Sequence, residues 1–237
     1  MKRPLIWKTI ADALLAEIAE GHYQPGDRLP SEAELSARFG VNRHTVRHAL
    51  AALIEDGVIR SRRGAGVFVT ARPTEYRLGR RVRFHKNVAA SGRTPSRRLT
   101  LMETRGADAK EAEALTIPAG GMVHVIEGIS LVDNQPLAVF RSVFDAARFP
   151  DLLRHMEGRQ SVTAALADCG LTDYTRAETR LTAKLAPATM ALALHVQEGT
   201  PVLRSIALNV DATGVPVEYG TTWFAGDRVT LTVTPGD

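Results

Sequence analysis

The stretch from residue 42 to residue 53 constrains this chain more than any other, because its apolar and basic residues separate at helical spacing. Asn42 is placed as the N-cap of a helix. The apolar side chains lie on one side: Val46, Ala49, Leu50, Leu53 and Ile54. The other side carries four donor-rich side chains: Arg43, His44, Arg47 and His48. This pattern is typical of a helix that enters the DNA major groove. A solvated amphipathic helix is the alternative reading.

The segments before this stretch favour the DNA-binding interpretation. Ser31 and Glu34 have the spacing of a capping box, which predicts that a second helix begins there and ends at Gly40. An earlier apolar periodicity, from Trp7 to Ile18, predicts a first helix. Two successive helices joined by a short turn, the second with polar residues at its start, predict a helix-turn-helix.

The segment after this stretch has the pattern of a β-hairpin. Residues 58–63 and 67–70 read as two strands, and Gly64-Ala65-Gly66 reads as the turn between them. A basic hairpin after a helix-turn-helix predicts a wing, with Arg62 and Arg63 near phosphates or the minor groove. The alternative is a hairpin that only covers the core.

Residues 5–70 resemble the DNA-binding domain of the GntR family of bacterial regulators. The similarity is carried by residues 26–32, 39–43, 45–47 and 57–68, together with Leu35. In that family, the arginines matching Arg43 and Arg47 touch the operator, and the glycine matching Gly64 approaches the minor groove. A further family arginine is replaced by Ala33 here. The resemblance implies double-stranded operator DNA as a partner, with contacts from Arg43, His44, Thr45, Arg47, His48, Arg62, Arg63 and Gly64.

The composition indicates where the chain meets a polyanion and in which compartment. Residues 71–105 hold ten Lys and Arg against two Asp and Glu, whereas the later residues are net acidic. The one cysteine, Cys169, rules out an intrachain disulfide and suits a reducing cytoplasm. The sequence shows neither a signal peptide nor an apolar run of membrane-spanning length, so we expect no membrane partner and a cytoplasmic location.

A linker is predicted over residues 71–82, between a DNA-binding domain at 1–70 and a second domain at 83–237. The basic run around it, which includes Arg83, allows three interpretations. It adds contacts to the DNA backbone, it holds a phosphate-like group of a small ligand, or it is a solvated linker.

The second domain carries an internal repeat with an offset of about eighty residues. Gly120 matches Gly199, Asp133 matches Asp211 and Pro136 matches Pro216. In each copy, a short helix precedes two long strands that are joined by a tight turn. This order predicts an antiparallel sheet with helices on one side, so the fold class is α+β.

The order of these elements resembles the UTRA effector domain of the HutC subfamily, over residues 80–235. The resemblance implies a small-molecule effector, a homodimer and a chorismate-lyase-like fold. Ser161, Thr163 and Glu218 match ligand-contacting positions of that subfamily. Two strand arginines of sugar-phosphate-sensing members fall on Gly128 and Ser130, and a strand glutamate falls on Phe140. A sugar phosphate or another small acid stays an alternative effector.

The segment 76–95 resembles regulators of phosphonate uptake and breakdown, and the similarity continues through 112–120 and 149–150. This resemblance implies a phosphate-like or phosphonate effector. The predicted effector-binding residues are Arg83, Asn87, Ser130, Ser161, Thr163 and Glu218.

Catalytic and metal-binding interpretations receive little support. His44 and His48 have the spacing of a two-histidine metal site, but no carboxylate or cysteine accompanies them in the sequence pattern. No nucleophile elbow or phosphate-cradling glycine loop occurs. We therefore expect no cofactor, no metal and no catalytic residue. The sequence predicts a ligand-responsive transcriptional repressor on a palindromic operator; a chorismate-lyase-like enzyme and a constitutive architectural DNA-binding protein are the alternatives.

Overall fold

The computed structural model describes residues 5–62, 64–70, 73–81, 83–158 and 161–234. The chain forms two compact units, residues 1–72 and residues 73–237. The predicted DNA contact Arg63 lies outside the described residues. Among the described residues, no helix combines the length and the apolar character needed to cross a membrane.

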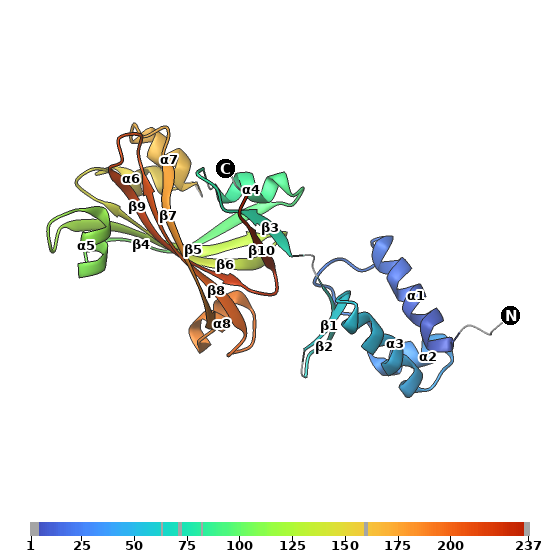
Figure 1. Cartoon of the computed structure of the whole chain (residues 1–237). Helices are drawn as coiled ribbons and strands as arrows, with labels where there is room; N and C mark the ends of the chain where they lie inside the picture. The colour runs from blue at the N-terminus through green and yellow to red at the C-terminus, as the bar shows by residue number, and fades with distance from the viewer. Residues whose placement is uncertain (1–4, 63, 71–72, 82, 159–160, 235–237) are drawn as a thin grey trace. The chain divides into compact units, whose positions relative to one another are not determined.

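The first unit contains three helices and a hairpin (Figure 1). Their bounds are α1 Ile6–Ala19, α2 Glu32–Phe39, α3 Arg43–Glu55, β1 Ile59–Arg62 and β2 Gly66–Val69. The two strands pair antiparallel, with Ile59 opposite Val69 and Arg62 opposite Gly66. Arg28 forms an isolated bridge to Phe68, which attaches the segment before α2 to the hairpin. This is the predicted helix-turn-helix with its wing.

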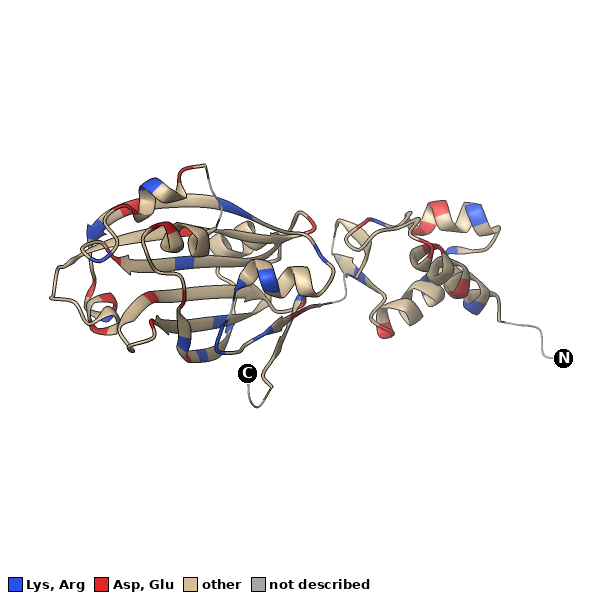
Figure 2. Ribbon diagram, turned by 90° about the horizontal axis from the view of Figure 1, so that it is seen from above, with Lys and Arg blue, Asp and Glu red and all other residues tan. Residues whose placement is uncertain are grey.

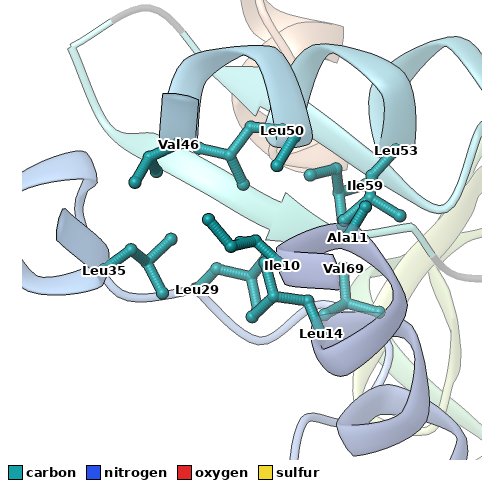
Figure 3. Close-up of a cluster of buried hydrophobic side chains, with 11 residues drawn as sticks. Ile10, Ala11, Leu14, Leu29, Leu35, Val46, Leu50, Leu53, Ile59 and Val69 are labelled. Atoms are coloured by element: carbon teal, nitrogen blue, oxygen red, sulfur yellow. The ribbon is translucent and has the colours of Figure 1, made fainter. Parts of the chain in front are cut away.

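The three helices and the hairpin share one apolar core (Figure 3). Leu14 of α1, Leu35 of α2 and Val46 of α3 are completely buried in it. The predicted apolar face of α3 is correct at Val46, Ala49, Leu50 and Leu53. It is wrong at Ile54, which is 40% exposed.

The predicted capping box at the start of α2 is confirmed. The backbone N–H of Glu34 donates to Ser31 Oγ at 3.3 Å, and the backbone N–H of Ser31 donates to Glu34 Oε2 at 2.7 Å. Two amide groups that the helix itself leaves without acceptors are thereby satisfied.

Replacing Ser31 with Ala is expected to destabilise α2 by about 1 kcal/mol, because the orphan amide at Glu34 loses its acceptor. Hydrogen–deuterium exchange of the α2 amides is expected to accelerate about fivefold for that free energy. Thr9→Ala, an exposed hydroxyl on α1, is the control. Unchanged exchange in Ser31→Ala would show that the cap contributes nothing to α2.

The second unit is organised by a six-stranded antiparallel sheet of order β4-β5-β6-β9-β8-β7. The strand bounds are β4 Pro95–Gly106, β5 Met122–Val132, β6 Gln135–Asp145, β7 Thr175–Leu185, β8 Pro201–Val210 and β9 Pro216–Ala225. From one edge the strands run β4, β5, β6, and from the other edge they run β7, β8, β9, so each half of the sheet holds three consecutive strands in the same order. The predicted repeat therefore forms the two halves of one sheet. Thr116 and His195, at equivalent helix ends, both adopt left-handed backbone conformations.

Helices cover both faces of this sheet, so the prediction of helices on one side is wrong. The helices are α4 Phe84–Ala90, α5 Ala109–Leu115, α6 Leu152–Met156, α7 Val162–Asp168 and α8 Ala188–Leu194. Phe144 packs with α6 and α7, whereas the preceding Val143 packs with α5. Successive strand residues point to opposite faces. Because β5 and β6 are apolar on both faces, both faces need a cover.

The predicted linker over residues 71–82 also needs correction. Residues 74–77 form strand β3, Thr74–Arg77, which pairs in parallel with β10, Val229–Thr232, near the end of the chain. Tyr76 and Phe84 join a buried cluster with Phe224 of the sheet. Residues 73–81 therefore belong to the second unit. A strand supplied by a distant segment leaves no local sequence signal, which is why a linker was predicted.

Candidate functional site

Helix α3 begins as predicted, with its first turn capped by Asn42. The Asn42 Oδ1 atom accepts hydrogen bonds from Thr45 N at 2.9 Å and from Thr45 Oγ1 at 3.0 Å. Thr45 is thus engaged in the cap and half-buried, while Arg43 and His44 are exposed. The first turn of α3 presents a cation and an imidazole to solvent, on a helix whose back is buried.

Arg47 is also exposed, and Glu32 of α2 binds its guanidinium group. The distances are 2.8 Å from Nη2 to Oε2 and 3.1 Å from Nε to Oε1. The hydrogen bond from Arg47 holds the pKa of Glu32 below its usual value. Acidic residues are interspersed among the basic ones in this unit (Figure 2). Glu32 therefore occupies the guanidinium group of one of the two predicted base-reading arginines.

Of the remaining predicted DNA contacts, His48 packs against another helix, and Arg62 and Gly64 lie in the wing. The ring of His48 stacks on Trp7 of α1, with centroids 4.4 Å apart. This packing role was not predicted. Arg62 is the last residue of β1. Gly64 has a φ of +76°, and a Cβ atom there would meet nothing within 4 Å. The wing turn thus leaves open space beside a backbone that favours glycine.

In the second unit, a polar cavity of about 50 Å³ lies between the sheet and β3. Its charged and polar lining comes from five strands: Tyr76, Ser142, Arg176, Ser205, Asn209, Glu218 and Thr222. Glu218 is the one predicted effector residue among them.

A chain of hydrogen bonds fixes the side chains of this cavity. Glu218 accepts from Ser142 Oγ at 2.6 Å and from Asn209 Nδ2 at 2.7 Å. Asn209 Oδ1 in turn accepts from Arg176 Nε at 2.7 Å. Arg176 Nη1 donates to Thr179 Oγ1 at 3.0 Å. The carboxylate and the guanidinium are thus held in place before any ligand arrives, which lowers the entropic cost of binding.

A second arginine, Arg97, lies against aromatic rings on the same face of the sheet. Its guanidinium carbon lies 4.7 Å from the ring centroid of Phe140 and 5.3 Å from that of Phe84. Burial raises the pKa of the Tyr76 phenol, while the charges of Arg97 and Arg176 act in the opposite direction. The two arginines therefore act on one buried hydroxyl group.

A wider and more open hollow of about 450 Å³ lies beside α4. Its lining is basic: Arg77, Arg80, Arg81, Arg83 and Lys86, with Asn87. The Arg83 guanidinium stacks 3.6 Å from the Tyr174 ring centroid, and its Nη2 donates to Tyr174 O at 2.8 Å. The Asn87 amide bonds the backbone N–H and C=O of Arg77, both at 3.1 Å. Asn87 thus fixes β3, and Arg83 is anchored at the rim of this hollow.

The other three predicted effector residues lie at or near the same face. Ser130 is buried and pairs across the strands with Arg97. Thr163 Oγ1 lies 3.1 Å from the Tyr174 hydroxyl group. Ser161 caps α7 by accepting from Ala164 N at 3.3 Å. The structure therefore separates the predicted set: Glu218 lines the inner cavity, Arg83 and Asn87 line the outer hollow, and Thr163 reaches Tyr174.

Comparison with known proteins identifies both units. The family of bacterial regulatory proteins named gntR matches residues 7–69, and the UTRA domain matches residues 90–230. An uncharacterized HTH-type transcriptional regulator of Rhizobium meliloti is 36% identical over 96% of this chain and 94% of its own length. The chain belongs to the GntR family of bacterial transcriptional regulators. The probable transcriptional regulator PhnF of Escherichia coli is 33% identical over 97% of this chain and 95% of its own length.

The fold of this GntR-family regulator is that of solved relatives. The crystal structure of PhnF from Mycobacterium smegmatis is 26% identical, with a TM-score of 0.67, and covers 94% of this chain and 98% of that protein. The predicted α+β architecture, with an N-terminal winged helix-turn-helix and a C-terminal UTRA domain, is confirmed.

Sequence reasoning placed Arg97 in the basic run without choosing it as an effector residue, and it missed Arg176 of this regulator. They occupy equivalent positions of the repeat, on β4 and β7, and their cross-strand partners Ser130 and Asn209 are equivalent too. The repeat spacing was the available signal, since it relates Arg97 to Arg176 as it relates Gly120 to Gly199.

The structure also explains why Gly128 occupies a position where sugar-phosphate-sensing members carry an arginine. A Cβ atom at Gly128 would lie 2.5 Å from Arg98 O and 3.0 Å from the Phe140 ring. The Arg98 carbonyl, together with the Phe140 ring, thus excludes a side chain at position 128. In this regulator, Arg97 of the neighbouring strand β4 places a cation on this face beside Arg176.

Replacing Glu32 with Gln in this regulator is expected to raise affinity for DNA of any sequence a few-fold, because one phosphate-repelling charge disappears and Arg47 is released. The measurement is fluorescence anisotropy with random-sequence duplexes at several salt concentrations. Glu55→Gln, an exposed carboxylate at the end of α3, is the control. Weaker binding by Glu32→Gln would instead assign Glu32 the task of orienting Arg47.

Proposed function

We propose that this protein is an operator-binding repressor whose first unit reads the major groove with Arg43, His44 and Arg47. The observation that supports this assignment is the exposure of these donors at the start of a helix whose back is buried. Thr45 and His48 stay predicted contacts beside them. The wing is proposed to approach phosphates or the minor groove with Gly64, flanked by Arg62 and Arg63.

We infer that the second unit binds a small anionic effector in the inner cavity. The supporting observation is a preorganised site with Arg176 and Glu218 in its wall and Arg97 on the same face. The proposed effector is of the phosphate or phosphonate class. Arg83 and Asn87 are proposed to guide the anion at the outer hollow, and Ser130, Ser161 and Thr163 to support the site.

For effector binding to change operator affinity, the protein must have two arrangements that differ in their affinity for the operator. We propose a homodimer in which each subunit contacts one half of a palindromic operator. An effector that binds one arrangement more tightly shifts the population toward it. Action on chromosomal DNA would place the protein in the cytoplasm, and phosphonate genes are the proposed targets.

The test begins with selection of a binding site from random-sequence DNA. Phosphate, sulfate, methylphosphonate and glucose 6-phosphate are then titrated, with melting temperature and operator anisotropy as readouts. An effector raises the melting temperature with concentration and changes operator affinity. Sedimentation equilibrium checks the dimer.

Arg176→Ala and Arg83→Ala are expected to abolish the melting-temperature rise. The control is Arg180→Ala, because Arg180 lies on the same strand and is exposed, pairing with Glu178. A selective rise with methylphosphonate or phosphate supports this effector class. No response to any anion would overturn the effector assignment. Operator binding would then be tested separately, by whether the selection from random-sequence DNA yields a binding site.

A further inference from the structure

The inner cavity holds a cation and a carboxylate that do not neutralise each other. The Asn209 amide lies between them, with its oxygen toward Arg176 and its nitrogen toward Glu218, both at 2.7 Å. A direct ion pair would have engaged the arginine fork and both carboxylate oxygens. The inserted amide keeps a positive and a negative pole separate in the wall of one cavity.

Each pole retains capacity for a ligand. Each carboxylate oxygen of Glu218 accepts one hydrogen bond, although a carboxylate offers about four acceptor positions. In the described part of the chain, Arg176 uses Nε and Nη1, and its Nη2 donates to no protein acceptor. Both residues line the cavity.

The surroundings make these unfilled positions costly. Asn209 and Ser142 are buried, at 5% and 6% exposed, and Arg176 and Glu218 are half-buried, so the network is largely shielded from bulk water. Charged groups in such a place gain stability from an opposite charge with matching hydrogen bonds. A simple anion would satisfy Arg176 and would bring a second negative charge near Glu218.

We propose that the ligand of this cavity is a small dipolar ion: a phosphonate or phosphate group bound by Arg176, joined by a short spacer to an ammonium group bound by Glu218. This proposal rests on the proposed effector site and specifies its ligand class. The positive pole of the ligand is what separates it from phosphate, sulfate and simple alkylphosphonates.

The test is isothermal titration of the full-length protein with 2-aminoethylphosphonate and propylphosphonate. These probes have the same chain length, and only the first carries an ammonium group. The expected result is at least a tenfold preference for 2-aminoethylphosphonate. In Glu218→Gln, the preference is expected to vanish while propylphosphonate binding is retained or strengthened, because the repelling charge is gone.

Glu127→Gln is the control variant. Glu127 pairs with Arg141 on the same sheet and does not line the cavity, so the preference is expected to persist. Equal binding of the two probes by the native protein would overturn the dipolar ligand and leave an anion effector standing. Binding of neither probe, with no binding of phosphate, would overturn the effector site itself. Because the two probes are compared on the native protein, this result does not depend on whether any variant folds.

Discussion

Replacing Arg47 with Ala is expected to lower affinity for the selected operator about tenfold to a hundredfold, while affinity for random DNA falls much less. An arginine that makes two hydrogen bonds to a guanine edge discriminates against other bases to this extent. Arg43→Ala, one helical turn earlier, is expected to behave in the same way, and the two losses to combine. The measurement is anisotropy with operator and random duplexes at one salt concentration.

Arg38→Ala is the matched control for this loss. Arg38 carries the same charge on α2 but is bound by Glu17 of α1, away from the predicted reading helix. A phosphate contact would give a different result, because its loss weakens binding to all sequences equally and reduces the salt dependence. Equal losses on operator and random DNA would therefore contradict base reading by Arg47.

Replacing Arg228 with Met is expected to destabilise the second unit by about 3 kcal/mol or more. The Arg228 side chain is 6% exposed and donates to Pro136 O at 2.6 Å, Leu194 O at 2.8 Å and His195 O at 3.1 Å. The last two carbonyls lie at the end of α8, where the helix dipole favours a cation. Methionine fills similar space but leaves three buried acceptors without this donor.

Urea unfolding followed by Trp223 fluorescence measures this effect. The chain has two tryptophans, so a Trp7→Phe background reports on the second unit alone. Arg180→Met is the control, because exposed ion pairs contribute little to stability and its effect is expected within error. A similarly small effect of Arg228→Met would show that water replaces the guanidinium at these carbonyls.

The DNA-binding unit was predictable because its signals are local. The Asn42 cap, the Ser31 capping box and the apolar spacing of α3 each depend on residues within one or two helical turns. The exposure of Ile54 and the stacking of His48 on Trp7 were not predictable from α3 alone. The stacking depends on where α1 packs, which the sequence of α3 does not specify.

The proposed effector site was only partly predictable, because its residues come from several strands. Glu218 entered through resemblance to ligand-contacting positions, whereas Arg176 and Asn209 had no local pattern of their own. The repeat spacing was visible in the turns and predicted an antiparallel sheet, yet it did not give the strand order that places β7, β8 and β9 side by side.

The sequence by itself determined the winged helix-turn-helix, the α+β class and the two-copy organisation of the second domain, because caps, turns and periodicity act between near neighbours. Tertiary structure decided the pairing of β3 with β10, the covering of both sheet faces and the meeting of Arg176, Asn209 and Glu218 in one cavity. These arrangements depend on strand register and burial between residues far apart in the chain, and it is that long-range packing which separates the two charges of the cavity with one amide.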